Sequence, residues 1–131
     1  MAHLNLLASA GRLLLALMFI LSGLGKIAAP DATQGFIASV GLPFPLLSYL
    51  VAVVVELGGG ILLVLGFQTK LVSLALAAFT FVTAVVFHTD FADQNQMIHF
   101  MKNISIIGGL LQVATFGAGS LSLDARRLRA A

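Results

Sequence analysis

The stretch VVVELGGGILLVLG, residues 53–66, is an apolar run that contains one carboxylate, Glu56, followed by three consecutive glycines. It belongs to a longer apolar segment, residues 46–66, which is followed by the polar turn FQTK. About 20 helical residues, each rising about 1.5 Å, cross the roughly 30 Å hydrocarbon core of a bilayer. The segment therefore predicts a membrane-spanning helix that carries a carboxylate near its midpoint.

The composition of the whole chain predicts an integral membrane protein. Of its 131 residues, 60% are hydrophobic and 9% are charged, whereas about 25% of residues are charged in soluble domains. So few charges cannot cover a water-facing surface. The formal charge of +2 comes without a basic patch interleaved with aromatic residues, which argues against nucleic-acid binding.

The absence of cysteine narrows the chemistry further. Thiol–disulfide exchange, a cysteine nucleophile and thiolate ligands for a metal all require this residue. The histidines and carboxylates lack a compact metal-binding spacing, so we expect no metal site. A haem held between His88 and His99 is a further alternative, although no other feature marks a porphyrin cleft.

Four apolar segments predict a single all-α domain over residues 1–131, a four-helix transmembrane bundle. They are residues 6–27, 46–66, 71–88 and 97–116. The connection between the first two contains Pro30, Gly41, Pro43 and Pro45, which rule out one uninterrupted helix. Within this connection, residues 33–41 predict a short helix at the membrane interface.

The distribution of charge predicts the orientation. Four spans place both termini on the same side of the membrane, whereas Lys26 and Lys102 lie on the other side, together with Asp31, Asp90 and Asp93. The basic residues on the side of the termini are Arg12, Lys70, Arg126, Arg127 and Arg129. The positive-inside rule then predicts cytoplasmic termini.

A carboxylate near the bilayer centre needs a partner. Glu56 is expected to face the bundle interior, take up a proton or meet a cation. The fourth span places His99, Lys102 and Asn103 on one helical face, at spacings of three and four residues. We expect Lys102, on its long stem, to approach Glu56, and Asn103 to satisfy the remaining lone pairs of the carboxylate.

Two other spans also end in polar side chains on the outer side of the membrane, opposite the termini. Ser22 and Lys26 share a face of the first span, and His88 ends the third. With Glu56 the deepest of the group, these side chains predict a polar pocket in the outer half of the bundle.

The cluster has two interpretations. In the structural one, Glu56 pairs with Lys102 or Lys26 and fixes the register between helices. In the functional one, the same groups line a ligand pocket, because ionisable residues inside a membrane commonly mark functional sites. Gly59 and Gly60 fit both, since small residues either let a neighbouring backbone approach or leave space for a flat ligand.

Three stretches carry a resemblance to a known family. They are LALMFILSGLGKI (residues 15–27), VELGGGILLVLGFQTKLVSLAL (55–76) and MKNISIIGGLLQVATFGAGSLSLD (101–124). In this order they resemble the DoxX family of small bacterial membrane proteins, over nearly the whole chain. The resemblance implies a four-helix bundle of the bacterial inner membrane. It also implies recurring polar positions, which are Lys26, Glu56, His88, Lys102 and Asn103.

The DoxX family is named for a subunit of a thiosulfate:quinone oxidoreductase, and relatives are associated with quinone or catechol stress and with membrane oxidoreductase assemblies. The resemblance therefore implies a quinone-associated redox or detoxification component that binds a quinone or catechol-like ligand. Glu56, as proton acceptor, and His88, as a second relay, are the candidate catalytic residues. The candidate ligand-binding residues are Lys26, Gly59, Gly60, His99, Lys102 and Asn103.

Electrons for such chemistry would have to come from a partner oxidoreductase subunit or a cofactor, because no side chain here supplies them. We therefore expect a binding or anchoring subunit in the bilayer, within a hetero-complex or a homo-oligomer. The alternative is a non-catalytic scaffold or a small-molecule permease with a structural Glu/Lys cluster. A permease would need polar groups through the inner half, where only a few are expected: Thr80, Thr83, Gln112 and Thr115.

Overall fold

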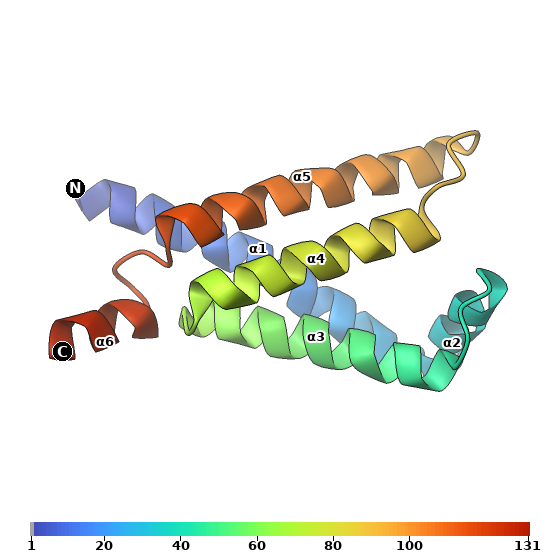
Figure 1. The fold of residues 1–131 in the computed structure, drawn as a ribbon, viewed down its shortest axis with the longest axis horizontal. Coiled ribbons are helices and arrows are strands. Elements are labelled where there is room, and N and C mark those ends of the chain that lie inside the picture. The colour runs from blue at the N-terminus through green and yellow to red at the C-terminus, as the bar shows by residue number, and fades with distance from the viewer. Residues whose placement is uncertain (1) are drawn as a thin grey trace.

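The computed structural model describes residues 2–131, and these form six α-helices (Figure 1). Four are long, namely α1 (Ala2–Ala28), α3 (Pro45–Leu65), α4 (Thr69–Phe87) and α5 (Gln94–Phe116). Each of these four is long and apolar enough to cross a membrane. The other two, α2 (Pro30–Ser39) and α6 (Leu123–Ala130), are short. The prediction of an all-α, four-helix transmembrane bundle is confirmed.

Helices α2 and α5 each begin three residues before their predicted starts, for local reasons. Helix α2 begins at Pro30, which fits the first turn because its missing N–H would have no partner there. Helix α5 begins at Gln94 because the Asp93 side chain accepts a hydrogen bond from Asn95 N, at 2.8 Å, and caps the helix.

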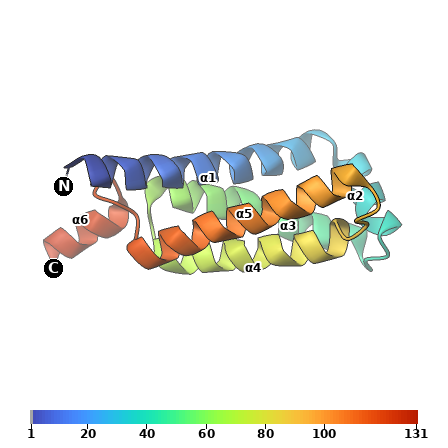
Figure 2. The ribbon, with the colours of Figure 1, turned by 90° about the horizontal axis from the view of Figure 1, so that it is seen from above.

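The long helices form two antiparallel pairs, α1 with α3 and α4 with α5. Figure 1 shows the α4–α5 pair diverging from α3 towards the end of the bundle that carries α2. Figure 2 shows that α6 and both termini lie at the opposite end. We call these the α2 end and the terminal end.

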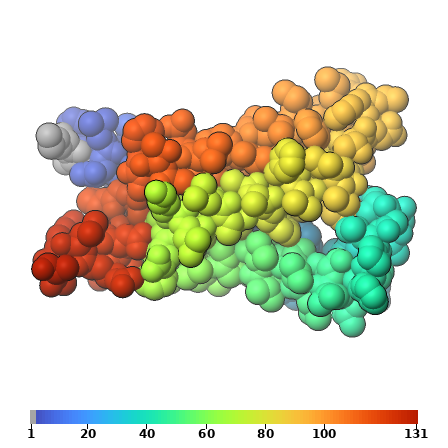
Figure 3. Space-filling model, viewed as in Figure 1, coloured from blue at the N-terminus to red at the C-terminus, as the bar shows by residue number. Residues whose placement is uncertain are grey.

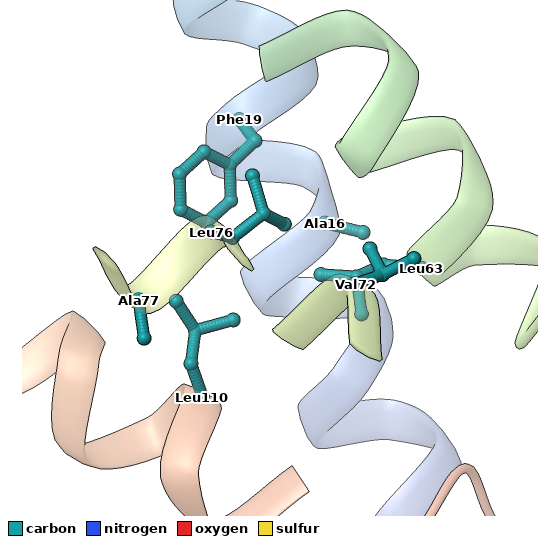
Figure 4. Close-up of a cluster of buried hydrophobic side chains, with 7 residues drawn as sticks. All are labelled: Ala16, Phe19, Leu63, Val72, Leu76, Ala77 and Leu110. Carbon is teal, nitrogen blue, oxygen red and sulfur yellow. The ribbon is translucent and has the colours of Figure 1, made fainter. Parts of the chain in front are cut away.

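The apolar core lies where the two pairs meet, and all four long helices contribute to it (Figure 4). Its buried members are Ala16, Phe19, Leu63, Val72, Leu76, Ala77 and Leu110. Gly60 lets α1 approach α3 closely, since a Cβ there would lie 3.2 Å from the carbonyl oxygen of Ala16. A Cβ at Gly59 would lie 2.7 Å from the Leu76 side chain. Both glycines therefore serve helix packing.

Arg12 and Asp124 hold the terminal end together. The buried Arg12 guanidinium donates hydrogen bonds to the carbonyl oxygens of Leu63 and Val64, at the end of α3. It also reaches the loop after α5, where it donates to Ala118 O at 3.0 Å and to Leu121 O at 2.7 Å. The Asp124 carboxylate accepts bonds from the N–H groups of Gln68 and Thr69 and so caps α4.

Candidate functional site

A cavity of about 870 Å³ lies at the α2 end of the bundle, among α1, α2, α3 and α4. Asn103 contributes to its lining from α5. Figure 3 shows the hollow between the yellow part of α4 and the green and teal atoms of α3 and α2. The cavity exists because the two helix pairs are packed tightly at the core and diverge beyond it.

The inner wall of the cavity carries a partly buried ion pair between α1 and α3. Lys26 Nζ lies 2.9 Å from Glu56 Oε2 and donates a hydrogen bond to Oε1 at 3.1 Å. Ser22 Oγ donates to the same Oε1 at 3.2 Å and accepts from Lys26 Nζ at 2.9 Å. Ser22 and Lys26 are four residues apart on one face of α1, so both reach the carboxylate from the same helix.

Glu56 retains unused hydrogen-bonding capacity. It is only 6% exposed, yet within the described chain its Oε2 atom accepts no well-aligned hydrogen bond. A carboxylate oxygen can accept two. The Lys26 side chain is 27% exposed, so the cationic end of the pair is accessible where the anionic end is not.

The opposite wall carries different polar groups. Asn103 provides an amide that both donates and accepts. His88 follows α4, and its Nδ1 atom lies 2.9 Å from Gln96 Oε1, which favours the tautomer with the proton on Nδ1. His99 lies outside the lining and stacks on His88, with ring centroids 5.1 Å apart.

Lys102 does not reach Glu56, contrary to the expectation from the sequence. It is exposed and lines a separate shallow groove on α5, next to Met101. Adjacent helical residues point about 100° apart, so Lys102 turns away when its neighbour Asn103 faces the bundle. Lys26 takes its place as the partner of Glu56 because α1, and not α5, packs directly on α3.

Gly59 and Gly60 are also outside the cavity lining, since they lie in helix contacts nearer the core. Two roles were considered for these glycines, close helix packing and space for a flat ligand. Their contacts agree with the first. Thr80 and Thr83, expected in the inner half of the bundle, instead line the cavity. Their hydroxyls donate to the carbonyl oxygens of Leu76 and Thr80 in their own helix.

Several aromatic rings complete the lining and were not predicted from the sequence as part of a site. Phe36 of α2 stacks on Phe87 of α4, with ring centroids 5.4 Å apart. Phe19 and Phe79 line the cavity as well. No local sequence signal distinguishes these rings from lipid-facing ones, because their role depends on which helices diverge.

Comparison with known proteins agrees with this fold. The DoxX family model matches residues 7–89. The chain belongs to the DoxX family. It is 38% identical to the inner membrane protein YqjF of Escherichia coli K12, over 86% of this chain and 85% of that protein. It is 40% identical to the inner membrane protein YphA of the same strain, over 88% of this chain and 86% of that protein.

No solved structure matches the chain. The four candidate membrane spans and the two inner-membrane relatives make this DoxX protein a multi-pass protein of the bacterial inner membrane. The matched residues 7–89 include both members of the ion pair and His88. Asn103 lies beyond them, on α5.

Proposed function

We propose that this DoxX protein binds a quinone or catechol-like ring in the cavity, with the Lys26–Glu56 pair as its polar anchor. The observation that carries the proposal is a partly buried ion pair, with Glu56 buried, on the wall of an otherwise largely apolar cavity of about 870 Å³. Buried charges inside a membrane are costly and commonly mark ligand or proton sites.

The chemistry of the lining fits such a ring. A quinone or catechol combines an apolar face with ring oxygens, and the cavity combines the rings of Phe19 and Phe79 with polar groups on two walls. Lys26 can donate a hydrogen bond to a ring carbonyl oxygen, and Glu56 can accept one from a ring hydroxyl. A quinone takes up protons when it is reduced, and Glu56 is the residue of the cavity lining that we propose to supply one.

Two further features support a binding role over transport. Towards the terminal end the cavity gives way to the apolar core, which Phe19 also joins, so the cavity lining does not extend through the whole bundle. No cysteine is available for thiol redox chemistry. We therefore propose a binding subunit of a quinone-linked redox or detoxification system, with electrons supplied by a partner.

The second candidate is a scaffold in which the ion pair only fixes α1 against α3. The observation that favours it is the set of hydrogen bonds among Lys26, Ser22 and Glu56. Removing one partner of a buried pair leaves an uncompensated charge and costs about 3–5 kcal/mol. Loss of the pair would then lower stability whether or not a quinone is added.

The binding proposal and the scaffold can be distinguished by the thermal stability of the detergent-purified protein, measured with added ubiquinone and menaquinone analogues. Binding to the native state raises its stability with ligand concentration. We expect such a rise in the wild type and its loss in a folded Glu56→Gln variant. No rise with any quinone, together with earlier melting of Glu56→Gln, would refute the binding proposal and support the scaffold.

The two lysines provide a matched control. Lys26→Met removes the cation that contacts Glu56, whereas Lys102→Met removes a cation that faces the separate groove. We expect Lys26→Met to abolish the quinone-dependent rise and Lys102→Met to retain it. An equal loss in both variants would contradict a site built on the Lys26–Glu56 pair.

A further inference from the structure

The cavity has an apolar rim between α3 and α4. Leu47 and Val51 on α3 and Val82 on α4 all line the cavity, yet they are 60%, 50% and 56% exposed. All three belong to membrane-spanning helices. Side chains exposed at such positions face lipid, so the cavity opens sideways into the bilayer.

The α2 end of the cavity is covered. Helix α2 lies across it, with Ile37 buried and lining the cavity. The Phe36–Phe87 stack joins α2 to the last residue of α4. An apolar molecule dissolved in the bilayer therefore meets an opening, whereas a molecule arriving along the bundle axis meets aromatic side chains.

We propose that the ligand is a quinone that carries an alkyl or isoprenoid chain and enters from the lipid between α3 and α4. Its ring reaches the Lys26–Glu56 pair, and its chain crosses the rim at Leu47, Val51 and Val82. The inference rests on the proposed function and narrows it, because it selects a membrane-dissolved quinone over a water-soluble catechol. The polar inner wall and the apolar rim match the two parts of such a molecule.

The test compares two quinones that share one ring, in lipid nanodiscs. The probes are 2,3-dimethoxy-5-methylbenzoquinone and its decyl derivative, with each Kd expressed against the quinone concentration within the lipid. The variant Val51→Trp fills the rim. The control Val54→Trp adds the same ring at a 68% exposed position of the same helix, outside the lining.

We expect Val51→Trp to weaken binding of the decyl quinone by about tenfold or more and to change binding of the tail-free ring by less than about twofold. Val54→Trp should leave both Kd values unchanged. If Val51→Trp does not fold, Val82→Trp on the opposite rim repeats the test, with Val85→Trp as its exposed control outside the lining.

Two results would overturn the inference. The first would refute only the lateral opening, and the second would also refute the proposed function. Binding of both quinones by the wild type, with no effect of Val51→Trp or Val82→Trp on the decyl quinone, would refute the lateral opening but keep the ring site. Absence of binding for both probes in the wild type would refute the proposed function itself.

Discussion

Arg12 is the most completely buried charged side chain in the described part of the chain, at 1% exposure. A helix leaves its last carbonyl oxygens without partners, and Arg12 satisfies those of Leu63 and Val64 at the end of α3. The same guanidinium holds the loop after α5 through Ala118 and Leu121. One side chain therefore joins α1, α3 and the C-terminal segment.

Arg12→Met should destabilise the protein strongly, because hydrogen bonds to a charged donor contribute about 1.5–3 kcal/mol each and several are lost together. The measurement is the free energy of unfolding in mixed micelles. The control is Arg126→Met, which removes an exposed arginine from the same end of the bundle. Equal destabilisation by the two variants would contradict the role given to Arg12.

For single residues, the sequence predicted which polar side chains lie in the spans better than it predicted their contacts. Glu56 and Lys26 were selected from their positions in apolar segments, and the structure joins them directly. Lys102 was assigned the wrong neighbour, because helical spacing places residues on a face but does not say which helix that face meets. For the same reason, the sequence did not predict that Arg12 joins α1 to α3 and to the loop after α5. The charge pattern indicates only that Arg12 lies on the side of the termini.

At the scale of the elements, the glycine triplet provides a matched test of α1–α3 packing. A Cβ at Gly60 would lie 2.7 Å from Ile20 Cγ1 and 3.2 Å from the carbonyl oxygen of Ala16, whereas a Cβ at Gly58 meets nothing within 4 Å. We expect Gly60→Ala to cost about 1–3 kcal/mol through overpacking. Gly58→Ala should be neutral or stabilising by up to about 1 kcal/mol, through helix propensity. Equal effects on the unfolding free energy would contradict the assigned contact.

The cap of α4 predicts a pH-dependent stability. Burial raises the pKa of Asp124, but hydrogen bonds from Thr69 and Gln68 and the nearby Arg127 outweigh it and hold the pKa below its ordinary value of 3.8. A carboxyl with a lowered folded pKa stabilises the protein above the unfolded pKa, and this stability is lost as the pH falls through the folded value. The Tm difference between the wild type and Asp124→Asn should therefore be full near neutral pH and shrink on acidification below about 4. A difference independent of pH would contradict the cap.

The number and type of the long helices were predictable from the sequence, because four long apolar segments leave few alternatives in a bilayer. The short helix α6 was not predicted. The first residue of each helix was less predictable. The start of α5 depends on the cap by Asp93, and the start of α2 depends on Pro30 in its first turn. The backbone turn at Gly66 was likewise not predictable from the local sequence alone. Its φ is +63°, and a Cβ at this position would collide with Ser122, which belongs to a segment far away in the sequence. Sequence periodicity does not report such a contact.

At the scale of the whole molecule, the bundle is closed at one end and divergent at the other. The Arg12 and Asp124 contacts and the apolar core occupy the terminal end, and the cavity occupies the α2 end. The sequence predicted polar groups in one half of the bundle. It also predicted a polar pocket in that half. It could not predict the α2 residues and aromatic rings of the lining, because these depend on which helices pair and where they separate. The cytoplasmic position of the termini stays a prediction from the charge pattern.

Binding of a quinone ring in the cavity beside Glu56 can be measured with an intrinsic reporter, because the chain contains no tryptophan. Phe79→Trp places a single indole in the cavity lining, and Phe116→Trp places one at the far end of α5, where Phe116 is 78% exposed. Decyl-ubiquinone should quench the first saturably, and adding Glu56→Gln should remove the saturable part. The second should show only linear, collisional quenching. Linear quenching of equal slope at both positions would contradict a quinone site in this cavity.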